Sequence, residues 1–489
     1  MINTKPLTIL HSNDMHGDFM AEELDNKLVG GVSLLSGYIQ RARREDPNVI
    51  YAVSGDMFRG SLIDSEYKGI STIEIMNMIA PDVVTIGNHE VDYGLAHLLF
   101  IEKCATFPII NANMFITSNH RRLFKSHHVI QIDGMNILFI GILTQDTIKA
   151  IKPDPLIGSF VDIAEAAAEV GRICNARRTE DMDLTVLLTH IGFEADKELA
   201  AALDPEWGVD VIIGGHTHTR LDEPAVVNGI YIVQAVMGTD QIGRFDIIVD
   251  TDNNCVHEWK WGLVPINEDT CPWDHELEEV IRSYKEETDT KYGRIVTRFA
   301  DVYTHPARNQ ETQLGRLFAD AFKDITKVDI MFVGSGSIRG EALGTIVTRE
   351  DLRTIFPYND AIYRVMVKGS TLKKMVKHIY RDAAWLPGGH TEFYQFSRGF
   401  RAEYNKKTKE LVSLSLNGYE ISDDDEFALG LQEYHYNNIE GSFNLTREEV
   451  EAIDRPKKIS TNSTDVIDEY FSDKELVRVS EETRMVFIE

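Results

Sequence analysis

The chain has 489 residues, 43% of them hydrophobic and 26% charged, a composition that excludes disordered, collagen-like and fibrous proteins. Its 50 basic and 78 acidic residues give a formal net charge of −28, which disfavours nucleic-acid polymers and anionic membranes as partners. The longest apolar stretch, around Ile137–Leu143, is too short for a membrane span, and Leu7–Leu10 is too short for a secretory signal, so we expect a cytoplasmic protein.

Short apolar, β-branched runs alternate with helical segments in the first half of the chain. Each run ends in Gly, Asn, Asp or His, and the runs begin at Leu7, Val49, Val83, Ile137, Leu184 and Val209. Helix-favouring stretches such as the Ala-rich segment Ala164–Ala176 lie between them. Strands interleaved with helices predict a layered α/β domain, in which ligands gather beyond the carboxyl ends of the strands.

The pattern changes after Pro265. We expect the last strand of the first domain at Phe245–Val249, and an acidic helix at Asp274–Tyr292, capped by Asp274, as a connector. An amphipathic helix is predicted at Gln313–Thr326, followed by a glycine-rich turn at Gly334–Gly340. The sequence therefore predicts a first domain over residues 1–265, a linker over 266–296 and a second domain over 297–489.

Residue types that can bind metal ions follow five of the predicted strands. They are Asp14 and His16 after the first strand, Asp56 after the second, Asn88 and His89 after the third, His190 after the strand beginning at Leu184, and His216 and His218 after the last. One such residue after a strand is more often a turn residue, but five blocks in succession are improbable by chance. Imidazole, carboxylate and amide oxygen together suit Zn²⁺ or Mn²⁺, with Fe²⁺ or Co²⁺ as alternatives.

The blocks NDMHG, GNHEVDYG and GGHTHT resemble those of calcineurin-like metallophosphoesterases and, more narrowly, of the 5′-nucleotidase family. This resemblance implies a four-layer α/β/β/α metallophosphoesterase domain followed by a smaller α+β substrate-binding domain. It also implies two divalent metal ions, the first held by Asp14, His16, Asp56 and His218, and the second by Asp56, Asn88, His190 and His216. By the same resemblance His89 forms a catalytic dyad with Asp92, which can orient its ring and raise its pKa.

The resemblance also implies substrate contacts in the second domain. Arg339 falls on the family's phosphate-contacting arginine in GSGSIRGE, where Gly334 replaces the usual Asn, and Arg308 matches a second such arginine. Tyr358 and Tyr434 fall where the family stacks the nucleobase between aromatic rings, and Glu440 stands near an Asp that contacts the ribose. Gly334 in place of the usual Asn, and Glu440 only near the position of the Asp, leave the nucleoside preference open. Each of the five candidate substrate residues also has an alternative role at the surface or in the core.

The resemblance implies a nucleoside 5′-monophosphate phosphatase that uses a metal-bound hydroxide as the nucleophile. Two other enzymatic functions remain open, namely a 2′,3′-cyclic-nucleotide phosphodiesterase and a UDP-sugar or dinucleotide pyrophosphatase. A nucleotide-binding sensor with a vestigial site is the non-enzymatic alternative. In each case the expected partner is a small nucleotide, with neither a nucleic-acid polymer nor a membrane, and the chain is expected to be a monomer or homodimer.

Overall fold

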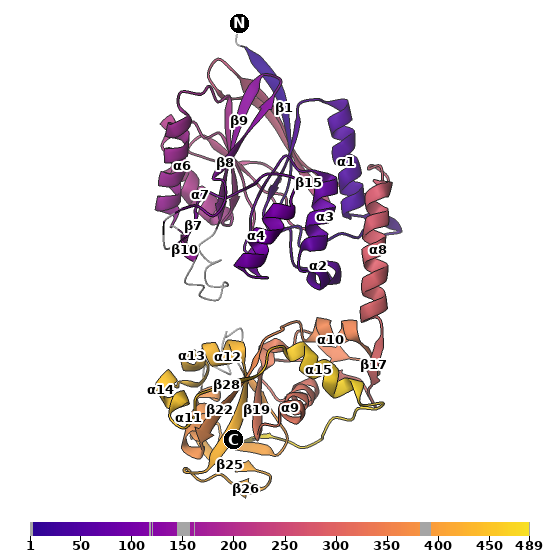
Figure 1. Cartoon of the computed structure of the whole chain (residues 1–489), viewed down its shortest axis with the longest axis vertical. Coiled ribbons are helices and arrows are strands. Elements are labelled where there is room, and N and C mark those ends of the chain that lie inside the picture. Colours follow the sequence, from indigo (N-terminus) through magenta and orange to yellow (C-terminus); the bar gives the residue numbers. More distant parts are fainter. Residues whose placement is uncertain are drawn as a thin grey trace. The chain divides into compact units, whose positions relative to one another are not determined.

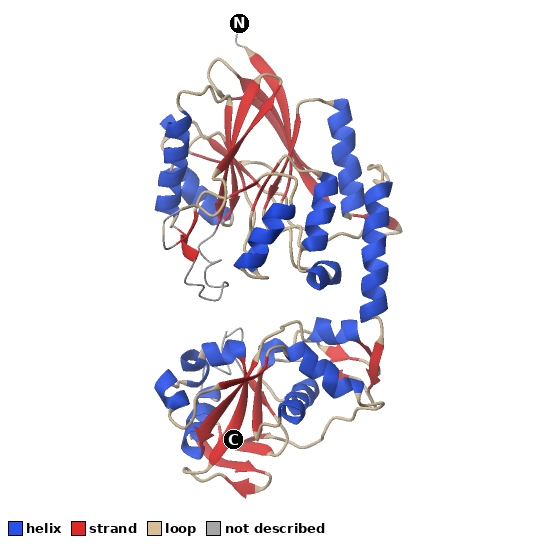
Figure 2. Ribbon diagram, in the orientation of Figure 1, coloured by secondary structure: helices blue, strands red, loops and turns tan. Residues whose placement is uncertain are grey.

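The computed structural model describes residues 3–116, 119, 121–143, 157–160, 162–381 and 393–488. The chain divides into two compact units, Met1–Thr288 and Asp289–Glu489. The division falls inside helix α8 (His275–Tyr292), whose first turn is capped as expected, because Asp274 Oδ1 accepts the backbone N–H of Leu277 at 3.2 Å. The chain order of all elements is labelled in Figure 1, and Figure 2 separates helices from strands.

The first unit contains two six-stranded sheets. The first has the order β16-β15-β1-β4-β5-β6, with bounds Cys255–Pro265, Gln241–Asp250, Thr4–Ser12, Val49–Ser54, Val83–Thr85 and Ile109–Ile110. The second has the order β13-β14-β12-β11-β9-β8, with bounds Ala225–Val227, Ile230–Val233, Val211–Ile213, Leu184–His190, Met135–Leu143 and His127–Ile132. In both sheets the central strands are parallel, so their carboxyl ends meet at one edge.

Helices cover the outer face of each sheet. Figure 1 shows α1 (Val32–Glu45) and α3 (Ile70–Ile79) on one side of the strands, and α6 (Ile163–Arg177) and α7 (Phe193–Ala202) on the other. The helix α4 (Leu95–Cys104) contributes to the same apolar layer as α1 and α3. Smaller elements of this unit are β2 (Glu22–Leu24), β3 (Lys27–Val29), α2 (Leu62–Tyr67), η1 (His89–Val91), β7 (Met114–Ile116), β10 (Ile157–Phe160) and η2 (Pro205–Trp207).

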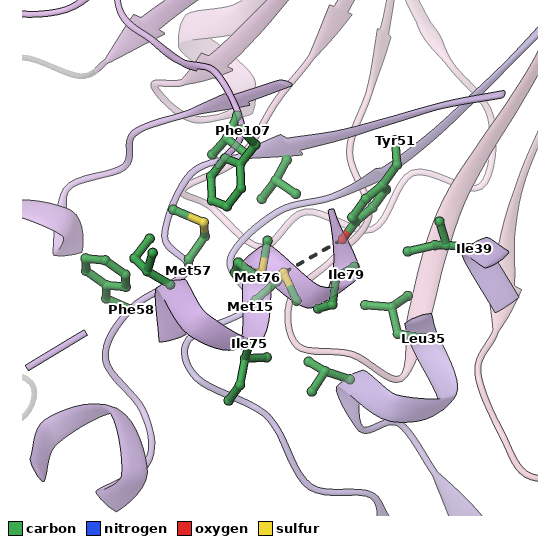
Figure 3. Close-up of a cluster of buried hydrophobic side chains, with 14 of the residues drawn as sticks. Met15, Leu35, Ile39, Tyr51, Met57, Phe58, Ile75, Met76, Ile79 and Phe107 are labelled. Atoms are coloured by element: carbon green, nitrogen blue, oxygen red, sulfur yellow. Dashed lines mark hydrogen bonds between the residues drawn. The ribbon is translucent and has the colours of Figure 1, made fainter. Parts of the chain in front are cut away.

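Three apolar layers hold these four layers of elements together. In the layer between α1, α3 and the first sheet, Leu35, Ile39 and Ile79 surround Tyr51 of β4, whose hydroxyl lies 4.0 Å from Met15 Sδ (Figure 3). A second layer fills the space between the two sheets, and a third lies under α6 and α7. Removing such side chains from water is the main stabilising contribution to the fold. The predicted α/β/β/α arrangement is confirmed.

The second unit is built around a five-stranded sheet and a four-stranded sheet. The five-stranded sheet has the order β23-β19-β27-β22-β28, with bounds Tyr394–Phe396, Ile330–Gly334, Glu426–Gln432, Ile362–Lys368 and Lys457–Ser460. The four-stranded sheet has the order β26-β25-β24-β29, with bounds Tyr419–Glu420, Glu410–Leu416, Phe400–Asn405 and Met485–Ile488. The predicted α+β class of this unit is confirmed.

Helices of the second unit pack against both faces of the five-stranded sheet. They are α9 (Gln313–Thr326), α10 (Arg349–Ile355), α11 (Gly369–Ile379), α12 (Glu433–Asn437), α13 (Ile439–Phe443), α14 (Arg447–Glu451) and α15 (Ser463–Ser472). The predicted glycine-rich turn contains η3 (Ser335–Ser337), and short strands complete the unit: β17 (Ile295–Arg298), β18 (Tyr303–Thr304), β20 (Ala342–Leu343) and β21 (Ile346–Thr348). The helix predicted at Gln313–Thr326 is confirmed at both ends, with Thr312 as its N-cap.

One expectation about the first unit is wrong. The strand expected at Phe245–Val249 is longer in the structure, and β16 follows it as a further strand of eleven residues. Because β16 lies at the edge of its sheet and has no fully buried residue, it lacks the continuous apolar run that marks the inner strands. Among the described residues no helix is long and apolar enough to cross a membrane, and the cytoplasmic location stays a prediction.

Candidate metal centre

The carboxyl ends of β1 and β4 carry three of the predicted ligands. Asp14 and His16 follow β1, and Asp56 follows β4, which pairs with β1 in parallel. The two loops lie side by side, because the N–H of Asp14 donates to Gly55 O and the N–H of His16 donates to Asp56 O, both at 3.0 Å. Both carboxylates are buried, and His16 Nε2 lies 3.9 Å from Asp14 Oδ1.

The second sheet brings three histidines to the same place. His190 is the last residue of β11, and His216 and His218 follow β12. His190 Nε2 lies 3.1 Å from Asp56 Oδ2, and His218 Nε2 lies 3.3 Å from Asp14 Oδ1. Ring nitrogens from one sheet therefore face carboxylates from the other.

Asn88 completes the cluster from the loop after β5. Its Oδ1 lies 2.7 Å from His216 Nδ1 and 3.2 Å from His190 Nε2. On the opposite side of the cluster, His16 Nε2 and His218 Nε2 are 3.2 Å apart. The structure thus brings together all seven residues that the sequence predicts as metal ligands.

The backbone at this site is strained. Asp14, His16, Asp56, His216 and His218 all have left-handed conformations, with φ between 49° and 80°. This conformation costs a non-glycine residue on the order of 1 kcal/mol or more, and persists only where the surroundings enforce it. Its concentration in five residues of one cluster indicates a functional site rather than ordinary turns.

His89 and Asp92 form the predicted pair. His89 Nδ1 lies 2.7 Å from Asp92 Oδ2, and the η1 turn between them fixes their spacing. Arg59 also contacts this carboxylate, with its Nη1 3.1 Å from Asp92 Oδ2, so two cationic or hydrogen-bonding groups hold Asp92 in place. Burial lowers the pKa of His89, but the hydrogen bond to Asp92 and the charge of Asp56 outweigh it, and the net shift is upward.

Two buried residues that the sequence analysis did not assign organise the ligands. The carboxylate of Glu90 accepts backbone N–H groups from both ligand loops, from Asp56 at 2.9 Å, from Met57 at 2.7 Å and from Gly87. Asn13 donates from Nδ2 to Asp14 Oδ2 at 2.7 Å and accepts the N–H of Ala235 at 2.8 Å. Their places beside ligands in GNHE and SNDMH were the signal that could have identified them.

Buried acidic and imidazole groups shift each other's pKa values at this site. Burial lowers the pKa of His190, yet the carboxylates of Asp56 and Asp14 outweigh it and raise this pKa to about 9. Burial alone would raise the pKa of Asp56, but the neighbouring His190 holds it well below its usual range. Asp56 therefore keeps its negative charge and attracts a cation, which is a proton where no metal ion competes.

The donor set fits two divalent cations. Three groups of potential ligand atoms each lie within 4.8 Å of one another: Asp14, His16 and His218; Asp56, His190 and His216; and His16, Asp56 and His89. Nitrogen and oxygen donors without thiolate suit ions such as Zn²⁺ and Mn²⁺ and differ from the thiolate-rich closed sites of structural zinc.

In the second unit the structure brings together two of the five predicted substrate residues. The Arg339 guanidinium lies over the ring of Tyr358, 5.1 Å from its centroid, and donates a hydrogen bond to its hydroxyl. Arg308 is exposed in the segment before α9. No ring contact joins Tyr358 to Tyr434 among the described residues, although Tyr434 is 60% exposed and available for stacking.

Glu440 lies in α13 and is exposed, and none of the predicted substrate residues contacts its side chain in the part of the chain that the structure describes. The stacked aromatic pair near α12 is instead Tyr363 with Tyr436, whose ring centroids are 4.3 Å apart. The sequence analysis did not assign this pair, because Tyr363 lies on β22 and the contact depends on how α12 packs.

Comparison with known families gives two matches along the chain. A model of the calcineurin-like phosphoesterases matches residues 7–220, and a model of the 5′-nucleotidase C-terminal domain matches residues 288–447. The first match includes all the predicted metal ligands and the His89–Asp92 pair. The second begins within α8 and includes Arg308, Arg339, Tyr358, Tyr434 and Glu440.

Individual proteins resemble the chain over most of its length. The 5′-nucleotidase of Mus musculus is 27% identical over 419 residues, which cover 76% of this chain and 71% of that protein. The crystal structure of a 5′-nucleotidase precursor from Thermus thermophilus has a TM-score of 0.68 at 22% identity and covers 99% of both chains. The NAD nucleotidase of Haemophilus influenzae has a TM-score of 0.58 at 19% identity over the full length of both chains. The Thermus thermophilus and Haemophilus influenzae structures therefore share the fold of this chain.

Proposed function

We propose, from the premise that this chain belongs to the 5′-nucleotidase family of calcineurin-like metallophosphoesterases, that it hydrolyses nucleoside 5′-monophosphates. It is a phosphoric ester hydrolase, with a phosphoesterase domain followed by a 5′-nucleotidase C-terminal domain. The single observation that carries the proposal is the convergence of nitrogen and oxygen donors from five loops at the carboxyl ends of β1, β4, β5, β11 and β12.

The proposed ligands form two sets that share one carboxylate. Asp14, His16 and His218 would hold one ion, and Asn88, His190 and His216 would hold the other, with Asp56 contributing to both. The assignment is supported by the short contacts within each set, such as His218 to Asp14 and Asn88 to His216. Manganese or zinc is the proposed metal, and iron or cobalt would suit the same donors.

The ions would supply Lewis acidity, which generates a nucleophile from water at neutral pH and neutralises charge on the phosphoryl oxygens. The protein's own contribution begins with Asp92, which orients the ring of His89 through the Nδ1 contact. A protonated His89 is then suited to stabilise the charge that develops on the phosphoryl group, or to protonate the leaving oxygen. Arg59 keeps Asp92 in place while this happens.

Substrate selection is proposed to reside in the second unit. Arg339 and Arg308 would contact the phosphate, Tyr358 and Tyr434 the base, and Glu440 the ribose. Support comes from the packing of Arg339 on Tyr358, which orders the guanidinium, and from the exposure of the Tyr434 ring. The substrate is a small nucleotide in this proposal, and the chain acts as a monomer or homodimer.

The test is a hydrolysis screen on purified protein, freed of metal by chelation and reloaded with Mn²⁺ or Zn²⁺, in which the nucleotide products are separated and quantified by chromatography. Its substrates are nucleoside 5′-monophosphates, 2′,3′-cyclic nucleotides, UDP-glucose and NAD. We expect the fastest turnover with a nucleoside 5′-monophosphate. Faster turnover of a cyclic nucleotide, UDP-glucose or NAD would replace the proposal with a phosphodiesterase or pyrophosphatase. Nucleotide binding without hydrolysis under any metal would indicate a sensor.

A further inference from the structure

One buried amide in the second unit connects two surface loops. Gln395 lies on β23 and is fully buried. Its Oε1 accepts the N–H of Thr312 at 3.1 Å, while its Nε2 donates to Gln310 O at 2.8 Å and to Ser335 Oγ at 3.0 Å. Both N–H groups of the amide are therefore used, and they join the segment before α9 to the glycine-rich turn.

Each of the two loops carries an exposed arginine. Arg308 lies two residues before Gln310, and Arg339 lies four residues after Ser335. The backbone of the turn is also bonded to the residue before β23, because the N–H of Ser335 donates to Phe393 O at 2.7 Å. The buried base of each loop thus fixes the backbone from which its guanidinium extends.

The start of α9 is shaped around the same amide. A Cβ atom at Gly315 would lie 2.2 Å from Gln395 Oε1, which is far inside van der Waals contact, so only glycine leaves room for the carboxamide there. Thr312 caps the helix by accepting the N–H of Gly315 at 3.0 Å. The first turn of α9 and the segment before it therefore pack directly around the Gln395 amide.

A second glutamine supports the turn from its other side. Gln432, buried at the end of β27, accepts the N–H of Gly334 at 3.2 Å and the hydroxyl of Ser337 at 3.1 Å. Of the two loops, the side chain of Gln432 bonds to the turn, whereas that of Gln395 bonds to both. The two segments are also joined by the backbone bond from the His305 N–H to Glu341 O at 2.7 Å, and Gln395 adds the buried side-chain link between them.

We propose that Gln395 is a positioning residue that sets the spacing of Arg308 and Arg339, and through it the affinity for a phosphate-bearing nucleotide. The inference rests on the proposed function, since it assumes that these arginines contact substrate. Gln395 is buried and acts only through the loops. The position requires one acceptor and two donors, which glutamine supplies, whereas glutamate would remove the donors and add a negative charge beneath two cationic loops.

The test compares Gln395→Met with the unaltered chain, using the nucleoside 5′-monophosphate that the latter hydrolyses fastest. We expect KM to rise about tenfold with kcat within twofold, because the arginines lose binding energy that is equal in the ground state and the transition state, while the metal centre is untouched. The matched control is Ser397→Ala, which removes a buried acceptor of the Met331 N–H next to β23 but contacts neither loop. It is expected to leave KM unchanged.

A double-mutant cycle separates positioning from general destabilisation. In a chain that already carries Arg308→Ala and Arg339→Ala, Gln395→Met is expected to raise KM no further. An equal rise in that background, or an unchanged KM in the single variant, would overturn the inference while leaving the proposed function intact. If no nucleotide is hydrolysed by the unaltered chain, both fail together. If Gln395→Met does not fold, Gln395→Asn provides a milder variant, because it retains the amide on a side chain one methylene shorter. Its KM is expected to lie between that of the unaltered chain and the tenfold higher value expected for Gln395→Met.

Discussion

Replacing Glu90 by glutamine tests how the metal centre is held. Each oxygen of the Glu90 carboxylate accepts two backbone N–H groups: Oε2 from Asp56 and Gly87, and Oε1 from Met57 and, at 3.3 Å, from Phe58. Glu90→Gln turns one oxygen into an N–H₂ group that faces two donors, so two charge-assisted hydrogen bonds are lost. Such bonds contribute about 1.5–3 kcal/mol each.

Part of this loss is offset, because burial and the nearby Asp56 raise the pKa of Glu90 to about 7, which makes its charge costly. We therefore expect Glu90→Gln to lower the free energy of unfolding by about 2–4 kcal/mol. The loops carrying Asp56 and Asn88 would no longer be held together, and metal affinity should fall roughly 10- to 100-fold, as is usual for residues that orient metal ligands.

The assay is urea unfolding in the presence of a chelator, followed by titration of the refolded protein with Mn²⁺ or Zn²⁺. Glu433→Gln serves as the matched control, since Glu433 is a buried acid of the second unit that pairs with Lys458. It should leave metal affinity unchanged. If Glu90→Gln binds both ions as tightly as the unaltered chain does, Glu90 does not organise the site and the reasoning is refuted.

Three further changes test other parts of the structure. Asp56→Asn should abolish hydrolysis with the fold retained by circular dichroism, because the carboxylate proposed to contact both ions is lost; normal turnover would contradict the metal assignment. Arg339→Ala should raise KM for nucleotides far more than for para-nitrophenyl phosphate, and equal effects would remove Arg339 from the proposed nucleotide contacts. Burial raises the pKa of Asp196 from 3.8 to about 7, so its stabilising contribution is complete below pH 3.8 and is lost as pH rises through 7. Asp196→Asn mimics the protonated form, which is hydrogen-bonded to Thr189. The difference between its free energy of unfolding and that of the unaltered chain, measured by urea unfolding, should therefore grow in its favour by about 2 kcal/mol from pH 5 to pH 8. A constant difference would mean that Asp196 does not titrate in that range.

The sequence was sufficient for the strands that end at the metal centre, because each is an apolar run followed by polar residues of a recognisable kind. Parallel pairing then places those residues at one edge of each sheet, whereas Asp14 and His218, about 200 residues apart, belong to different sheets and meet because the two sheets stack. The strand β16 was missed for the opposite reason. At the sheet edge none of its residues is fully buried, so it lacks the apolar run on which these predictions depend.

The supporting residues could not be derived in the same way. Glu90 acts through backbone N–H groups of another loop, and Gln395 joins segments that lie about 80 and 60 residues away in sequence. Neither contact has a local signature, since it depends on how distant loops pack. Tyr358 and Tyr434 show the same limit, because sequence matching gives the residue type but not whether two rings face each other.

The donors of the metal centre are distributed from Asp14 to His218, across loops that belong to both sheets. In the described part of the first unit, neither sheet alone carries all the proposed ligands of either ion, so the full proposed set assembles only after both sheets have formed and stacked. An ion that binds solely to this finished state shifts the equilibrium away from unfolded chains in proportion to the logarithm of its free concentration. The supply of the ion would thus govern how long the protein survives in a cell, as well as how fast it works.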